Sequence, residues 1–168
     1  DAVTRFSYGV LLARVPLFMF QAIQASLLPR LARLAAQRSF DEFRRGLRLL
    51  VIVVAGIGVA GTIFGALLGP WTLRLVYDAD LGGRTLAMLA LSSALYMMAL
   101  AVSQAVLALE DHAYVALGWV ISIIMFVIGT WLSSDDVFQR IEIGLVASSA
   151  AAVIAFGLRL RRRLSTLT

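Results

Sequence analysis

The chain contains no cysteine and no lysine, and it has one histidine, His112, among 168 residues. The absence of cysteine excludes disulfides, thiol catalysis and cysteine-ligated metals. Without a second histidine, a cysteine or a lysine we expect no nucleophile–base pair, and therefore no enzyme. We also expect no metal or cofactor, because Asp78–Gly83 lacks the acidic ligand that ends a calcium-binding loop and Glu110–His112 has no companion ligands.

Charge is scarce and apolar residues are abundant. Hydrophobic residues make up 61% of the chain and charged residues 15%, whereas a soluble domain has about 45–50% and about 25%. The composition therefore predicts an integral membrane protein. The net charge of +5 comes from arginines at the ends of apolar runs, which is typical of membrane-flanking charge and argues against nucleic-acid binding.

Five apolar runs approach the length of about 20 residues that a membrane-spanning helix needs. They cover residues 6–28, 49–71, 86–109, 114–132 and 143–160. None alternates polar and apolar residues as the strands of a membrane barrel do. The sequence thus predicts an all-α integral membrane protein with five transmembrane helices.

Arginine is distributed unevenly between the connections. Residues 30–48 hold six arginines and the end of the chain from residue 159 holds four, whereas the two other long connections hold only Arg74, Arg84 and Arg140. Positive charge concentrates on the cytoplasmic side of a membrane. We therefore expect residues 30–48 and the tail, 161–168, to be cytoplasmic, in a multi-pass protein of the bacterial inner membrane.

The basic connection also carries local signals. Leu31 and Leu34 lie among its arginines, which predicts a short amphipathic segment at the inner headgroups. We expect its arginines to set the topology, with binding of anionic membrane lipid as the alternative. Ser39 and Glu42 form a capping-box pattern, so a helix should begin near Phe40 and continue into the second span.

The beginning of the chain suggests that more protein precedes it. A first span that starts outside is already under way at Phe6, with neither a methionine nor a basic leader before it. The chain also has an odd number of predicted helices and ends in a basic tail, which suits the last part of a longer membrane protein. We therefore expect the C-terminal part of a larger transporter, whose N-terminal lobe would be a partner.

Polar residues form stripes on two of the predicted spans. At 100° per residue, Ser7, Arg14 and Gln21 lie within about 40° of one another, with Gln24 about 80° further round. The third span has a stripe of its own, which consists of Ser93, Tyr96, Ser103 and Gln104. An arginine facing lipid at mid-membrane costs at least ~2.5 kcal/mol.

These stripes predict a shared hydrated cavity for an anionic, hydroxyl-rich substrate. Its expected lining is Arg14, Gln21, Gln24, Tyr96 and Gln104. Pro16 should bend the first span beside Arg14 and free a carbonyl there. The alternatives are an Arg14 that extends to the outer headgroups and an internal clamp between arginine and carbonyl groups.

Glycines recur on the second span. Gly61, Gly65 and Gly69 fall at every fourth residue on one side of the helix. Small residues at this spacing let a second helix approach closely in a membrane. We expect tight bundle packing at this position, with a sliding surface of a moving transporter as the alternative.

The stretch "FSYGVLLARVPLFMFQAIQASLLPRLARLAAQRSFDEFRRGL" resembles the eighth helix and following loop of oligosaccharide-lipid flippases in the multidrug/oligosaccharidyl-lipid/polysaccharide exporter superfamily. The stretch "GALLGPWTLRLVY" resembles the outer end of the ninth helix. The specific likeness covers about a third of the chain. It implies a two-lobed exporter of twelve to fourteen helices that moves an undecaprenyl-pyrophosphate-linked glycan by alternating access, with Arg14 meeting the anionic head.

One feature departs from part of that family. Flippases of the peptidoglycan branch tend to carry another arginine one turn earlier, where this chain has Val10 and Leu11. The departure favours an exporter of O-antigen or capsule polysaccharide. A drug-extruding relative, or a non-transporting scaffold of a glycan-synthesis complex, remains as the alternative.

Overall fold

The N-terminal apolar run is divided into two helices. In the computed structural model, which describes residues 2–77, 82–133 and 136–166, α1 (Ala2–Ala13) and α2 (Val15–Ala36) lie on either side of Arg14. Pro16 lies in the first turn of α2, where its fixed φ suits a helix start but its missing N–H leaves the carbonyl four residues earlier without that bond. The bend expected at Pro16 is therefore a break at Arg14. For some residues of α1, α2 and the end of α4, only the backbone is described.

Five further helices follow in the described part of the chain. They are α3 (Phe40–Leu67), α4 (Gly69–Tyr77), α5 (Gly83–Ala108), α6 (His112–Trp131) and α7 (Val137–Thr166). Four of these, α3, α5, α6 and α7, are long and apolar enough to cross a membrane. The predicted all-α membrane character is thus confirmed, while the run predicted as the first span is shared between α1 and α2.

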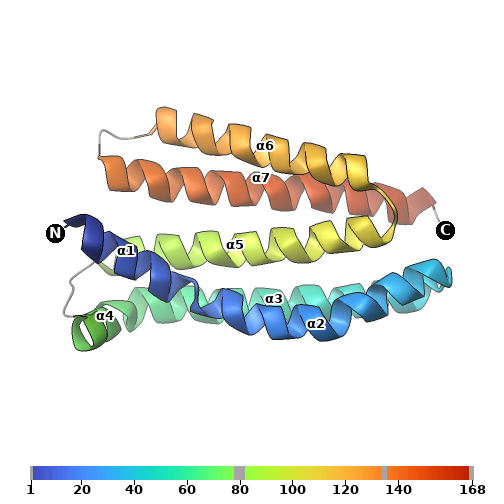
Figure 1. Cartoon of the computed structure of the whole chain (residues 1–168), viewed down its shortest axis with the longest axis horizontal. Coiled ribbons are helices and arrows are strands. Elements are labelled where there is room, and N and C mark those ends of the chain that lie inside the picture. Colours follow the sequence, from blue (N-terminus) through green and yellow to red (C-terminus); the bar gives the residue numbers. More distant parts are fainter. Residues whose placement is uncertain (1, 78–81, 134–135, 167–168) are drawn as a thin grey trace.

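Helix α5 lies at the centre of the bundle. It packs against α3, α7 and α2, and α6 covers the far side of α7 (Figure 1). The long helices alternate in direction, so the α2–α3 turn, the α5–α6 turn and the end of α7 gather at one end. The N-terminus and α4 lie at the other end (Figure 1).

The turn between α2 and α3 is compact because two backbone bonds close it. The N–H groups of Arg38 and Ser39 donate to the carbonyls of Ala35 and Leu34, each at 3.0 Å. Arg38 adopts the left-handed conformation, with φ of 54°, that ends many helices. Helix α3 then begins at Phe40 as predicted, although the side chain of Ser39 makes no capping hydrogen bond.

Leucines of the basic connection are buried instead of lying at the surface of the bundle. Leu31 and Leu34 are 2% and 6% exposed and join the same core as Phe43 and Leu47. Because Pro29 does not end α2, residues 30–36 continue that helix and bring both leucines against α3. The expected separate segment at the headgroups is therefore the last two turns of α2.

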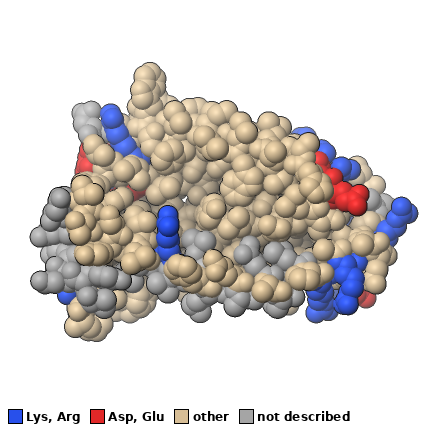
Figure 2. All heavy atoms as spheres, viewed as in Figure 1, with Lys and Arg blue, Asp and Glu red and all other residues tan. Residues whose placement is uncertain are grey.

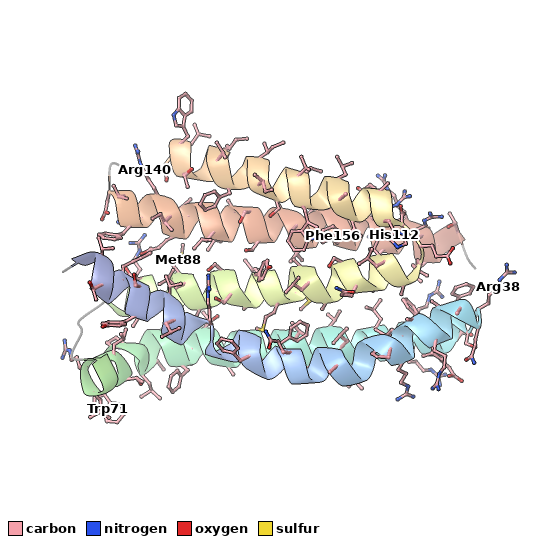
Figure 3. The ribbon with its side chains drawn as sticks, viewed as in Figure 1. Arg38, Trp71, Met88, His112, Arg140 and Phe156 are labelled. Atoms are coloured by element: carbon pink, nitrogen blue, oxygen red, sulfur yellow. The ribbon has the colours of Figure 1, made fainter. Side chains whose placement is uncertain are left out.

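Charged side chains gather at one end of the bundle. Figure 2 shows most of the arginines at the end that carries the α2–α3 turn and the end of α7, next to a largely uncharged middle. We call this end, formed by residues 30–48, 109–112 and 159–166, the basic end. Arg38 and His112 lie there, whereas Trp71 and Arg140 lie at the opposite end (Figure 3).

Glycines bring α3 close to α5. A Cβ atom at Gly65 would lie 3.1 Å from the carbonyl oxygen of Leu86 and 3.2 Å from the Cβ of Ala90, and one at Gly69 would lie 2.8 Å from Leu86. Gly58, which sequence analysis did not single out, lies equally close to α5. Gly61 is only half-buried. The close approach therefore follows Gly58 and Gly65 on one side of α3 and continues at Gly69, the first residue of α4.

Candidate functional site

A cavity of about 560 Å³ opens between the N-terminal helices and α5, α6 and α7. Four helical segments contribute its walls. The lining residues are Val10, Arg14, Phe18 and Gln21 from the N-terminal segment, Leu89, Ser92, Ser93 and Tyr96 from α5, Trp119 and Ser122 from α6, and Leu145, Ser148 and Ser149 from α7. The size and the mixed polar and apolar walls are those of a small-ligand site.

Three of the five residues predicted to line a cavity meet here. Arg14 and Gln21 face Tyr96 across the cavity. Gln104 is not among the lining residues, since it lies eight residues beyond Tyr96 on α5, about 12 Å further along the helix. The side chain of Gln24 lies outside the described part of the structure.

Arg14 occupies the break between α1 and α2. Its N–H donates to the carbonyl oxygen of Leu11 at 3.1 Å, which makes a tight turn instead of a regular helical bond. Its side chain is exposed at the cavity wall and is the only charged group among the described lining residues. No described side chain pairs with it, so the donors of its guanidinium are available to an anion.

Hydroxyl groups cover the opposite walls. The Oγ of Ser92 donates to the carbonyl oxygen of Leu89 at 2.8 Å, and the Oγ of Ser122 on α6 donates to the carbonyl oxygen of Ser148 on α7 at 3.0 Å. These protons are directed into the backbone, which leaves the oxygen lone pairs as acceptors. The cavity thus offers cationic donors on one wall and hydroxyl acceptors on the others.

Aromatic side chains line the side of the cavity nearer the basic end. The rings of Tyr96 and Trp119 lie 5.9 Å apart, and those of Trp119 and Phe156 lie 5.3 Å apart in an edge-on arrangement. Phe156 on α7 (Figure 3) is fully buried, and Gly118 on α6 leaves room for its ring. Beyond the other side of the cavity, Phe6 and Phe138 pair at 4.9 Å.

A carboxyl group lies buried near this site. Glu142 lies in the second turn of α7 with 1% of its surface exposed. Its Oε2 has no hydrogen-bond partner among the described residues. Leu145 and Ser149, three and seven residues later on the same side of α7, line the cavity. An acid is thus buried one turn from the cavity wall.

A second polar cluster holds the basic end together. The Oδ2 of Asp111 accepts hydrogen bonds from the Nε atoms of Arg159 at 2.5 Å and of Arg163 at 3.0 Å. Arg159 also lies over the ring of Tyr114, with its Cζ 4.8 Å from the centroid. The hydrogen bond from Arg159 and the charges of both arginines lower the pKa of Asp111, against the opposing effect of burial. We call these four residues the Asp111 clamp, which ties the α5–α6 turn to α7.

Asp111→Asn should destabilise the bundle by about 1–3 kcal/mol at neutral pH, because it removes the acceptor charge from hydrogen bonds to charged donors. Since folding lowers the pKa of Asp111, the stabilisation is full above the unfolded value of about 3.9 and disappears as pH falls through the folded value. Thermal unfolding in detergent at pH 7 and below pH 4 measures both effects. The control is Glu110→Gln at an exposed neighbour. A stability difference between the native protein and the Asp111→Asn variant that does not shrink in acid would contradict the clamp.

Sequence reasoning missed the contributions of α6 and α7. Ser122 is a hydroxyl within a strongly apolar run, and Ser148 and Ser149 stand in a run of alanines. These isolated hydroxyls were the available signal. For the Asp111 clamp the signal was the spacing of Arg159 and Arg163, which places them on one side of a helix.

Comparisons with known proteins give distant relatives. The chain is similar to two proteins of Mycobacterium tuberculosis, from strains CDC 1551 / Oshkosh and H37Rv, each described as an uncharacterized protein. The identity is 37% over 116 residues, which are 67% of this chain and 26% of each relative. The chain therefore spans about a quarter of the length of the curated relatives it matches. No protein-family model and no solved structure matches it.

Proposed function

We propose that the chain is the C-terminal portion of a flippase that moves an undecaprenyl-pyrophosphate-linked oligosaccharide across the bacterial inner membrane for surface polysaccharide assembly. The observation that carries the proposal is the meeting of Arg14 with hydroxyl-bearing walls in one cavity. A permanent, planar cation suits a phosphate. Serine oxygens and amides suit the hydroxyls of a sugar.

In this proposal different cavity residues bind different parts of the substrate. The guanidinium of Arg14 holds the pyrophosphate, as charge-assisted hydrogen bonds are the strong ones. The serine oxygens of α5, α6 and α7 accept hydrogen bonds from sugar hydroxyls, and Tyr96 and Trp119 offer ring faces. The break at Arg14 lets α1 tilt independently of α2. The Phe6–Phe138 pair closes the site on one side until α1 tilts.

The architecture is proposed as one lobe of a two-lobed exporter, with α1 and α2 together as the fifth span. The relatives are long enough to hold a further lobe, because the matched stretch is 26% of each. The side chain of Arg14 is exposed at the cavity in the described bundle, and such a lobe would complete the cavity around it. An N-terminal lobe is therefore the proposed partner.

Deleting the gene should abolish surface polysaccharide and let the lipid-linked oligosaccharide accumulate in the inner membrane. The expected accumulation follows from loss of the transport step while synthesis continues. Extraction of glycolipid, with surface staining alongside, measures both quantities, and the native gene should restore them. A fall in glycolipid synthesis without accumulation would favour the scaffold instead, and normal surface polysaccharide would contradict the proposal.

The proposed orientation places the basic end in the cytoplasm, because positive charge is retained there. Cysteines introduced at Gln37 and Thr166, both exposed at that end, should resist an impermeant thiol reagent in whole cells. A cysteine at Gly82, an exposed position with open space around its Cβ, should react. Reaction at Gln37 and Thr166 with protection at Gly82 would reverse the orientation.

A further inference from the structure

A groove runs along the surface of the basic end. It has a volume of about 490 Å³ and lies between α3 and α7, both of which pack against α5. Its lining consists of Arg44 from α3 and of Gly157, Leu160, Arg161, Leu164 and Ser165 from α7. We call it the basic groove. It is separate from the cavity around Arg14, with which it shares no lining residue.

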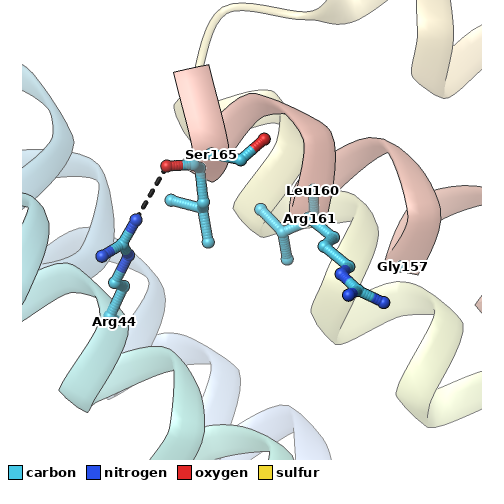
Figure 4. Close-up of a pocket in the computed structure, with 6 residues that line it drawn as sticks. Arg44, Gly157, Leu160, Arg161 and Ser165 are labelled. Atoms are coloured by element: carbon cyan, nitrogen blue, oxygen red, sulfur yellow. Dashed lines mark hydrogen bonds between the residues drawn. The ribbon is translucent and has the colours of Figure 1, made fainter. Parts of the chain in front are cut away.

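Two arginines give the groove its charge. The Nη2 of Arg44 donates to the carbonyl oxygen of Leu164 at 2.7 Å, and this bond holds the half-buried guanidinium against the last turns of α7 (Figure 4). One such bond leaves most of the five guanidinium donors available. Arg161, which is exposed, extends along α7 toward Gly157 (Figure 4). The described lining contains no acidic side chain, so nothing in it neutralises these charges.

The rest of the groove is apolar and open. No heavy atom lies within 4 Å of the position that a Cβ would take at Gly157. Leu160 and Leu164 form the adjoining wall. Gly157 lies about 12 Å along α7 from Ser165, at 1.5 Å per residue. The groove therefore joins the cationic groups of Arg44 and Arg161 to an apolar wall formed by Leu160 and Leu164.

We propose that the basic groove binds one anionic glycerophospholipid of the surrounding membrane. Arg44 and Arg161 hold the phosphate, as basic pockets between membrane helices do with anionic headgroups. One acyl chain lies over Gly157 and against Leu160, at the depth where hydrocarbon begins. A zwitterionic lipid presents the same chain but carries its own cation, so the groove selects for net negative charge. This site does not depend on which glycan, if any, the protein transports.

The test reconstitutes the full-length protein into vesicles of equal parts phosphatidylglycerol and phosphatidylcholine, and then measures lipid retained on the extracted protein by native mass spectrometry. The native protein should retain phosphatidylglycerol in excess. Gly157→Trp fills the groove and should remove the excess, whereas Gly56→Trp, at an exposed glycine with equally open surroundings, should keep it. Arg161→Gln should lower retention about tenfold, as loss of a hydrogen bond to a charged group implies, whereas Arg162→Gln should not.

The comparison of Arg161→Gln with Arg162→Gln keeps the test decisive even if Gly157→Trp fails to fold. Both arginines are exposed, so neither substitution should disturb folding. Equal retention by Arg161→Gln and Arg162→Gln would overturn the proposal. So would equal retention of the two lipids by the native protein. If the native protein retained no lipid, and chemical crosslinking showed another protein segment in the groove, that result would also overturn the proposal.

Discussion

Gly65→Leu should disrupt the packing of α3 on α5, whereas Leu67→Ala, two residues away, should be tolerated. A Cβ at Gly65 already lies 3.1 Å from a backbone carbonyl of α5, which can move only if the whole helix moves. The remaining leucine atoms have no space, so the helices must separate. Overpacking typically costs about 1–3 kcal/mol and occasionally more, and the loss of a close helix contact in lipid adds to it.

Leu67 provides the matched control because 73% of its surface is exposed. Its truncation removes lipid-facing atoms and leaves α5 untouched. Thermal unfolding and size-exclusion profiles in one detergent compare the variants. Gly65→Leu should melt well below the native protein, and Leu67→Ala should melt close to it. Equal melting temperatures for the two variants would show that α3 does not depend on this contact.

Much of the fold could be predicted because a membrane restricts the choice of structure. Lipid offers no partner for backbone N–H and C=O groups, so long apolar runs without alternation must be helices. The start of α3 at Phe40 and the interruption near Pro16 followed from local chemistry. The limits of the apolar runs differ from those of the helices. Helix α7 continues through Arg159–Arg163 to Thr166, whereas the run 49–71 crosses the end of α3 at Leu67 and the start of α4 at Gly69.

Other features depend on contacts between helices, which periodicity within one helix does not contain. The stripe of Arg14 and Gln21 predicted a polar side but not that Ser122, Ser148 and Ser149 would face it. Gln104 shares an arc with Tyr96 yet lies too far along α5 to reach the cavity. An angular stripe thus predicts the side of the helix on which a residue lies. The position of that residue along the helix axis must be judged separately.

The acidic residues show a second limit. Glu110, in the turn between α5 and α6, is exposed. Asp111 instead accepts two arginine hydrogen bonds, and Glu142 is buried inside the bundle. Both lie within two turns of a helix start, where sequence alone does not tell a side chain that faces solvent from one that turns inward.

Arg14→Ala should abolish most of the protein's transport while the protein still folds. The guanidinium has no described partner in the bundle, so its removal breaks no contact that holds the helices together. Its loss removes charge-assisted hydrogen bonds to an anionic substrate, each of about 1.5–3 kcal/mol, which corresponds to roughly a 10- to 150-fold weaker interaction. Arg14→Lys keeps the charge but lacks the planar fork, so its effect should be intermediate.

An arginine that only extends to the headgroups predicts a different pattern. Lysine reaches the same headgroups with the same charge, so Arg14→Lys would then transport normally. Arg84→Ala supplies the control, because Arg84 is an exposed arginine at the opposite end from the basic end and outside the cavity. This variant should transport as the native protein does.

Complementation of a strain that lacks surface-polysaccharide export, with the amount of folded protein in the membrane measured alongside, tests the role of Arg14 directly. The account predicts that export falls in the order native, Arg14→Lys, Arg14→Ala at equal protein levels, with Arg84→Ala unaffected. Full export by Arg14→Ala at a normal protein level would contradict it.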